Sequence, residues 1–341
     1  MSYWAHWDGA WYTEIASEGY EAHAPASYAF FPVFPMIVRV ASALGGGPAL
    51  WGILVSLAAT VFALYFLYST AEKLQDRNTA RAATLGLALF PTAFYLNAPF
   101  TEALFLAFAI GAYWAAYVRR DLLLAGVLGA LAAATRNLGV LLLVPLGYEW
   151  LRNRREFGWR GVWEMAIVPT GLLGYVAFLW TRFGDPLIFA DVQTTYWGRG
   201  LTNPGATLQD AWIDAGEGLR YILDPATLFL DSSASPALEV SGIVNIAFLV
   251  LFLVLMGMGF AVLPPGLSLY SFSVLLLHII TPSPLIPLLG LPRFMLEAFP
   301  LFVVVGLVLS RSRLALGSWL LLSGGLGTAL TILFVTWRWV A

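Results

Sequence analysis

The chain contains no cysteine among its 341 residues, and only 11% of its residues are charged. The absence of cysteine excludes disulfides, thiolate nucleophiles and cysteine-based metal sites. A soluble globular domain usually carries about 25% charged residues, whereas 60% of this chain is hydrophobic. The composition therefore predicts an integral membrane protein.

Sequence motifs for metals, nucleotides and secretion are also missing. The three histidines, His6, His23 and His278, are scattered, and no HExxH motif occurs, so we expect no protein-bound metal. Gly45-Gly46-Gly47 belongs to neither a GKS nor a GxGxxG motif, which argues against a nucleotide-binding domain. We expect no cofactor and no nucleic-acid partner. Residues 1–8 have neither a basic start nor an apolar core, so no cleavable signal peptide is expected.

Long apolar segments fill most of the chain. We place them at residues 48–71, 82–98, 102–118, 122–135, 138–151, 162–182, 242–262, 267–281, 294–309 and 314–337. Some are shorter than the roughly 20 residues that a simple span needs. The short neighbours 122–135 and 138–151 flank Arg136, which predicts two half-helices that meet inside the membrane. We expect an all-α polytopic protein with about 8–10 transmembrane or half-membrane helices.

The basic residues predict the orientation. Eleven lie in one set of short loops: Lys73, Arg77, Arg81, Arg119, Arg120, Arg152, Arg154, Arg155, Arg160, Arg311 and Arg313. Seven lie on the opposite side: Arg39, Arg136, Arg182, Arg199, Arg220, Arg293 and Arg338. Because basic loops remain in the cytoplasm, the second set is expected to be external.

This orientation divides one integral membrane domain, residues 1–341, into four parts. We expect an external loop with interfacial helices (1–47), a helical core (48–182), a second external loop (183–241) and carboxyl-terminal helices (242–337). Within the second loop, residues 208–223 predict a helix lying on the membrane surface. Its carboxylates fall near one face: Asp210, Asp214 and Glu217.

The first external loop carries a polar, aromatic segment, His6-Trp7-Asp8-Gly9-Ala10-Trp11-Tyr12. Asp8 has two interpretations. It is either the amino-terminal cap of a helix over residues 9–17, or a functional carboxylate at the membrane interface. The surrounding rings fit either a sugar-binding surface or an interfacial aromatic belt.

Two arginines on the same side as Asp8 also need an explanation. Arg136 lies between strongly apolar runs, and Arg293 follows a proline-rich break. A buried arginine is paired, snorkels to the interface or faces a polar cavity. Together the two could clamp a phosphate, or each could pair with Glu102 or Glu297. Glu102 itself is explained equally well as a carboxylate at a helix amino terminus.

Six motifs, in order, resemble those of the PIG-V type mannosyltransferases and their prokaryotic relatives. The first loop of that family is similar to His6-Trp7-Asp8-Gly9 with Ile15-Ala16 and Gly19-Tyr20. Its next motifs resemble Phe30-Phe31-Pro32-Val33-Phe34-Pro35, Thr101-Glu102-Ala103-Leu104-Phe105 and Thr135-Arg136-Asn137-Leu138-Gly139. The last two resemble Gly184-Asp185-Pro186-Leu187 with Gln193 and Trp197-Gly198-Arg199, and Pro292-Arg293-Phe294 with Phe299-Pro300-Leu301.

The resemblance implies a GT-C fold and an inverting glycosyltransferase. Such an enzyme moves a sugar, mannose in particular, from a polyprenyl-phosphate donor to an acceptor hydroxyl outside the membrane. By this resemblance Asp8 is the general base, and Arg136 and Arg293 bind the donor phosphate. The residues expected at the sugar or acceptor are His6, Trp7, Trp11, Glu102 and Gln193. The resemblance also implies a multi-pass protein of the plasma membrane with an extracytoplasmic active site.

Two departures from the family pattern are visible. Family members carry a transmembrane helix before the first loop, and only five residues precede His6 here. Either the start lies further upstream, or this chain does without that helix. In the family motif TRSNG, the Ser-Asn pair is replaced by Asn137-Leu138, which affects acceptor recognition more than the chemistry.

Two other functions fit the sequence. One is a transporter or flippase of lipid-linked sugars, which would also contain broken helices and arginines at membrane depth. The other is an inactive family member whose site is not assembled. The acceptor stays open among lipid, polysaccharide and protein hydroxyls, and nothing in the sequence indicates the oligomeric state.

Overall fold

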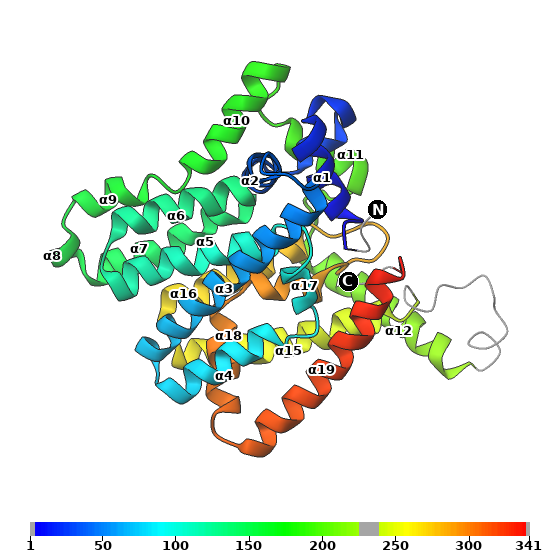
Figure 1. The fold of residues 1–341 in the computed structure, drawn as a ribbon. Helices are drawn as coiled ribbons and strands as arrows, with labels where there is room; N and C mark the ends of the chain where they lie inside the picture. The colour runs from blue at the N-terminus through cyan, green and yellow to red at the C-terminus, as the bar shows by residue number, and fades with distance from the viewer. Residues whose placement is uncertain (1–3, 225–238, 339–341) are drawn as a thin grey trace.

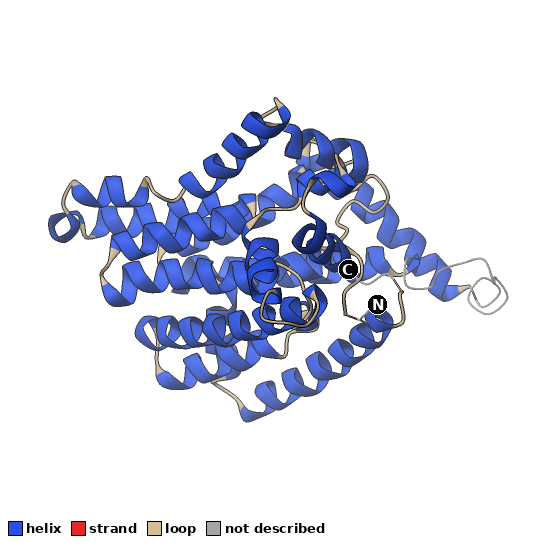
Figure 2. Cartoon of the chain, turned by 45° about the horizontal axis from the view of Figure 1, so that its top comes forward, coloured by secondary structure: helices blue, strands red, loops and turns tan. Residues whose placement is uncertain are grey.

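The computed structural model describes residues 4–224 and 239–338 and is all-helical over these residues (Figure 2). Four helices occupy the first part of the chain: α1 (Asp8–Glu18), α2 (Val33–Ser42), α3 (Pro48–Leu74) and α4 (Arg77–Ala88). The middle contains α5 (Glu102–Trp114), α6 (Leu122–Thr135), α7 (Leu143–Arg152), α8 (Arg154–Phe157), α9 (Arg160–Met165) and α10 (Thr170–Phe183). The rest comprises α11 (Ile188–Trp197), α12 (Pro204–Leu223), α15 (Ser241–Val262), α16 (Pro265–Ile280), α17 (Leu291–Phe294), α18 (Pro300–Leu309) and α19 (Arg313–Val335). The predicted all-α fold is confirmed.

Among the described residues, α3, α15 and α19 are each long and apolar enough to cross a membrane. Their surfaces remain apolar where no other helix covers them, as at Phe62 of α3, Val254 of α15 and Leu321 of α19. Such large exposed side chains suit contact with lipid rather than water. These helices are those of a multi-pass membrane protein.

The segment predicted at 294–309 is not one straight helix. Residues Leu291–Glu297 form α17 and a 3₁₀ turn, which meet α18 at an angle of 93°. Pro300 begins α18 at a position where its missing N–H costs nothing. The bent pair would form a fourth span, and its first arm carries Arg293 and Glu297.

The segment predicted at 82–98 is also interrupted. Helix α4 ends at Ala88, and a 3₁₀ turn, Ala93–Leu96, leads to the start of α5. Thr60 of α3 donates a hydrogen bond to the carbonyl of Leu96 (2.7 Å). A Cβ atom at Gly52 of α3 would lie 2.6 Å from Pro99 Cβ. The turn that precedes α5 is therefore fixed against α3.

The predicted break at Arg136 is present. Helix α6 ends there with extended backbone (φ −154°, ψ 139°), and a 3₁₀ segment, Asn137–Leu142, leads into α7. This segment packs directly on α6, because a Cβ atom at Gly139 would lie 2.3 Å from the backbone nitrogen of Ala133. Glycine permits this close approach, and the reversal projects the Arg136 side chain from a helix end.

The segment predicted as the second external loop contains two helices, α11 and α12, within its described residues. The helix expected at 208–223 is observed as α12, which begins four residues earlier at Pro204. Asn203 caps it by accepting a hydrogen bond from Gly205 N (2.8 Å). Trp197 of α11 contacts Trp11 of α1 edge-on, with ring centroids 6.5 Å apart, so the two regions that were predicted to be external pack together (Figure 1). Residues 225–238 of the predicted loop lie outside the described residues.

Small residues set the distance between α4 and α18. A Cβ atom at Gly306 would lie 2.5 Å from the carbonyl oxygen of Thr79 and 2.6 Å from the nitrogen of Ala83. Glycine and alanine at such contacts allow two membrane helices to approach closely. The packing of α18 positions the bend that carries Arg293.

We predict that Gly306→Ala destabilises the protein by about 1–3 kcal/mol, because the added methyl group would overpack this contact. The measurement is thermal unfolding in detergent. Gly317→Ala in α19 is the matched control, since nothing lies within 4 Å of its Cβ position. Equal unfolding temperatures for the two variants would contradict the packing described.

Candidate active site

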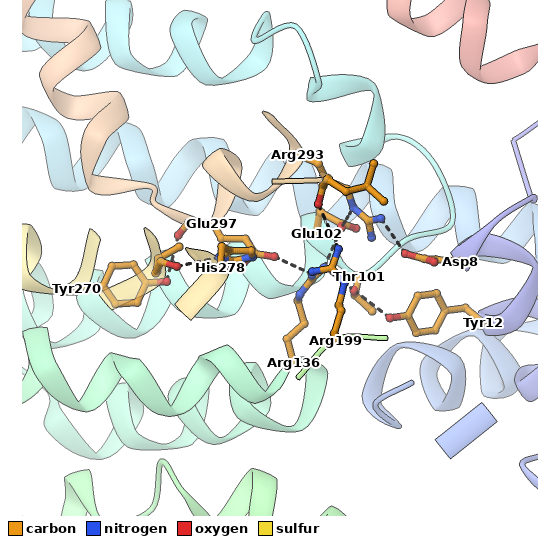
Figure 3. Close-up of polar contacts among 12 residues, drawn as sticks. Asp8, Tyr12, Thr101, Glu102, Arg136, Arg199, Tyr270, His278, Arg293 and Glu297 are labelled. Atoms are coloured by element: carbon orange, nitrogen blue, oxygen red, sulfur yellow. Dashed lines mark hydrogen bonds and ion pairs between the residues drawn. The ribbon is translucent and has the colours of Figure 1, made fainter. Parts of the chain in front are cut away.

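Asp8, Glu102, Arg136, Arg293 and Glu297 form one continuous ion-pair network (Figure 3). These residues come from α1, α5, the end of α6 and the bent segment 291–297. Helices far apart in the sequence therefore converge on one small charged region. A charge inside an apolar environment is costly unless it is paired.

Asp8 is the first residue of α1 and not its cap, so the interpretation of Asp8 as a helix cap is wrong. Trp7 occupies the cap position with φ 54°, a conformation that residues with a side chain rarely adopt. The Asp8 carboxylate instead accepts from Arg293 Nη1 (2.8 Å), and its side chain is 33% exposed. Asp8 is the most exposed carboxylate of the network.

Glu102 is the centre of the network. Its side chain is fully buried, and its Oε1 atom accepts from Arg136 Nη1 (2.8 Å) and from Arg293 Nε. It also lies in the first turn of α5, where the helix dipole favours a negative charge. Glu102 therefore pairs with the arginines and also lies at a helix amino terminus, which were the two structural interpretations of this residue.

Arg136 is engaged on both sides. Beyond Glu102, its Nη2 atom lies 2.8 Å from Glu297 Oε1, and its Nη1 atom donates to Thr101 Oγ1 (3.1 Å). The hydroxyl of Tyr12 lies 3.2 Å from the same Thr101 oxygen. The pairing of the arginines with Glu102 and Glu297, one of the alternatives left open by the sequence, is thus observed.

A third arginine, Arg199, belongs to the same region. The guanidinium carbons of Arg136, Arg199 and Arg293 lie 5.9, 5.5 and 5.9 Å from the ring centroid of Phe294. Burial, with the positive charge of Arg293 as the next cause, lowers the pKa of Arg199. Arg199 is not among the site residues expected from the sequence, although it lies in the motif Trp197-Gly198-Arg199.

The predicted sugar and acceptor residues occupy different environments. His6 is buried and donates from Nε2 to the carbonyl of Phe334 in α19 (2.7 Å), which brings the two ends of the described chain together (Figure 1). Trp11 stacks on Phe30 with centroids 5.4 Å apart. Trp7 is 37% exposed. Gln193 lies in α11, six residues before Arg199.

The contacts of His6 fit a neutral imidazole. Its Nδ1 atom is buried and has no hydrogen-bond partner among the described residues, so a proton there would be unsatisfied. Burial lowers the pKa of His6, against the opposing effect of its hydrogen bond to Phe334. In this geometry His6 joins α1 to α19.

A cavity of about 430 Å³ lies beside the network, between α12 and the proline-rich segment 282–287. Its walls include the carboxylates of Asp210, Asp214 and Glu217, together with Gly198. Burial, with Glu217 nearby, raises the pKa of Asp214. This cavity is acidic, whereas the three guanidinium groups surround Phe294. Within residues 4–224 and 239–338, no group of histidines and carboxylates is arranged to hold a metal ion.

Comparison with known proteins supports the family suggested by the motifs. The family model Mannosyltransferase (PIG-V) matches residues 1–151, a stretch that includes Asp8, Glu102 and Arg136. This match confirms the predicted family over that part of the chain. A search of curated proteins gives no match.

Two solved structures share the fold. They are ArnT from Cupriavidus metallidurans in the apo state and the same protein bound to undecaprenyl phosphate, at 14% and 15% sequence identity and TM-scores of 0.56 and 0.57. They cover 90% and 94% of this chain, which in turn spans 55% and 58% of theirs. ArnT is a GT-C glycosyltransferase, so the predicted GT-C fold is confirmed.

We predict that Glu102→Gln lowers the free energy of unfolding by about 3–5 kcal/mol, because it leaves two largely buried guanidinium groups (side chains 18% and 12% exposed) without their shared carboxylate. Thermal unfolding in detergent measures this change. The control is Glu72→Gln, which breaks an exposed pair with Arg77 (side chains 37% and 70% exposed) and should cost no more than about 1 kcal/mol. Similar losses in both variants would contradict the central position of Glu102.

Proposed function

We propose that this chain, whose residues 1–151 match the PIG-V mannosyltransferase family, is an inverting glycosyltransferase of the plasma membrane. It moves a sugar, mannose in particular, from a polyprenyl-phosphate donor to an acceptor hydroxyl on the extracytoplasmic face. The observation that carries the proposal is the contact between the half-buried Asp8 carboxylate and Arg293, whose side chain is only 12% exposed.

The proposed reaction is a single displacement. The acceptor hydroxyl attacks the anomeric carbon, and Asp8 receives the proton of that hydroxyl as the new C–O bond forms. The bond between the anomeric carbon and the phosphate oxygen breaks, and its electron pair remains on the lipid phosphate. Without a covalent intermediate, the anomeric configuration inverts, as in inverting glycosidases.

The leaving group explains the need for cations. The donor is a phosphodiester with one negative charge, and the released lipid phosphate is a monoester with more negative charge. Guanidinium groups fixed in a water-poor site stabilise such developing charge. We propose that Arg293, which touches both Asp8 and Glu102, faces the phosphate, and that Arg136 contributes its charge from behind Glu102. ArnT bound to undecaprenyl phosphate supports a lipid phosphate as the ligand of this fold.

The remaining site residues fall into two groups in this proposal. Trp7 and Trp11 lie at the same helix end as Asp8 and are candidates for contact with the sugar, and Gln193 is a further candidate for contact with the sugar or acceptor. Glu102 and His6 are both buried. We assign them the positioning of Arg136 and Arg293 and of the α1 segment, rather than direct contact with substrate.

We predict that Asp8→Asn reduces sugar transfer by about 10²–10⁴-fold, because the amide cannot accept the proton of the acceptor hydroxyl. Transfer of radiolabelled mannose from polyprenyl-phosphate mannose is measured in membranes that contain the protein. The amide oxygen of this variant can still accept a hydrogen bond from Arg293, so binding of the donor should persist.

Glu21→Gln is the matched control, since Glu21 forms an exposed pair with Arg182 (2.6 Å) outside the network. It should transfer sugar at the wild-type rate. Transfer by Asp8→Asn at a rate close to that of the wild type would exclude Asp8 as the base. A wild-type protein that moves lipid-linked sugar across the membrane without transferring it would indicate a flippase instead.

A further inference from the structure

Arg199 differs from Arg136 and Arg293 in one respect. Both of those arginines have direct carboxylate partners. Arg199 has none in the described part of the chain: its Nη2 atom donates to the carbonyl of Leu289 (3.2 Å), and its guanidinium lies over Phe294. Its full positive charge is therefore not neutralised by a direct contact.

The backbone holds Arg199 in place from both sides. Its nitrogen donates to the carbonyl of Gln193 (3.1 Å), and Thr194 Oγ1 donates to its carbonyl (3.2 Å). The preceding Gly198 has φ +63°, and a Cβ atom there would lie 2.4 Å from Pro284 Cγ. This turn requires glycine, and it fixes the direction of the next side chain.

The charge balance of the region depends on Arg199. The network contains three carboxylates, Asp8, Glu102 and Glu297, and two guanidinium groups, Arg136 and Arg293. Three carboxylates against two cations would disfavour an anion. Arg199 makes the number of guanidinium groups equal to that of the carboxylates, and it lies beside the same Phe294 ring as the other two.

The neighbouring cavity offers no alternative place for an anion. Asp210, Asp214 and Glu217 line it, and their charges would oppose a phosphate. A guanidinium presents a planar set of donors that matches the oxygens of a phosphate group. Because the cavity is lined by carboxylates and Arg199 presents a guanidinium, an anion is expected to bind on the side of Arg199.

We propose that Arg199 is the receptor for a phosphoryl group, and that it holds the phosphate together with Arg293. The inference rests on the proposed function in one respect only, namely that the phosphate belongs to a lipid donor. In that arrangement Arg293 contacts both the phosphate and Asp8. Arg199 supplies a positive charge that is not already engaged by a carboxylate.

Binding of polyprenyl phosphate and of inorganic phosphate to the detergent-solubilised protein tests this assignment. We expect Arg199→Gln to weaken binding of the lipid by about 10–100-fold, the scale of charge-assisted hydrogen bonds. The affinity of Arg199→Lys for the lipid should lie between those of the wild type and of Arg199→Gln, because lysine keeps the positive charge but loses the planar set of donors. Arg182→Gln is the control, since Arg182 is an external arginine that is 62% exposed.

The outcomes separate this inference from the proposed function. Loss of polyprenyl-phosphate binding in Arg199→Gln but not in Arg182→Gln supports the inference, even if the wild type transfers no sugar. If Arg199→Gln loses binding of inorganic phosphate, and polyprenyl phosphate does not bind even to the wild type, the phosphoryl site is supported. Its ligand is then free phosphate and not a lipid phosphate. Equal binding of both ligands by wild type and Arg199→Gln would overturn the inference, even if sugar transfer is demonstrated. Circular dichroism of the variant verifies that it is folded.

Discussion

One carboxylate, that of Glu102, holds two guanidinium groups together in a buried position, and the arrangement of the candidate site depends on it. Arg136 comes from the end of α6 and Arg293 from the bent segment before α18, and both reach the same Oε1 atom. Two positive charges would repel each other at this distance in a medium of low dielectric constant. The buried carboxylate makes their proximity favourable, and α3 fixes the turn that presents it.

The same interaction connects the helical core to the first segment of the chain. Arg293 touches Glu102 on one side and Asp8 on the other, so the position of a half-buried carboxylate in α1 is set by a fully buried one. Broken helices supply these charged groups, because a helix end or bend can project a side chain into the space between helices. The interruptions at Arg136 and at residues 291–300 are thus the elements that form the site.

Much of this arrangement was predictable from the sequence, and some was not. Hydropathy indicated the helical membrane architecture, and the short segments around Arg136 indicated a break, because length and polarity are local properties. The pairing of Arg136 and Arg293 with Glu102 was left open, since it depends on contacts between residues up to 191 positions apart. Arg199 was missed although it lies in the motif Trp197-Gly198-Arg199, because its place near Phe294 and Leu289 depends on contacts about 90 residues away along the chain. These contacts distinguish it from exposed arginines such as Arg182.

A structure of the protein in complex with a non-hydrolysable polyprenyl-phosphate sugar would show whether this network is the donor site. We predict that the phosphate lies in contact with Arg293 and Arg199, and that the sugar extends from it toward Asp8. A headgroup bound at the opposite end of the helices, for example beside α8, with no contact to any residue of the network, would contradict this assignment.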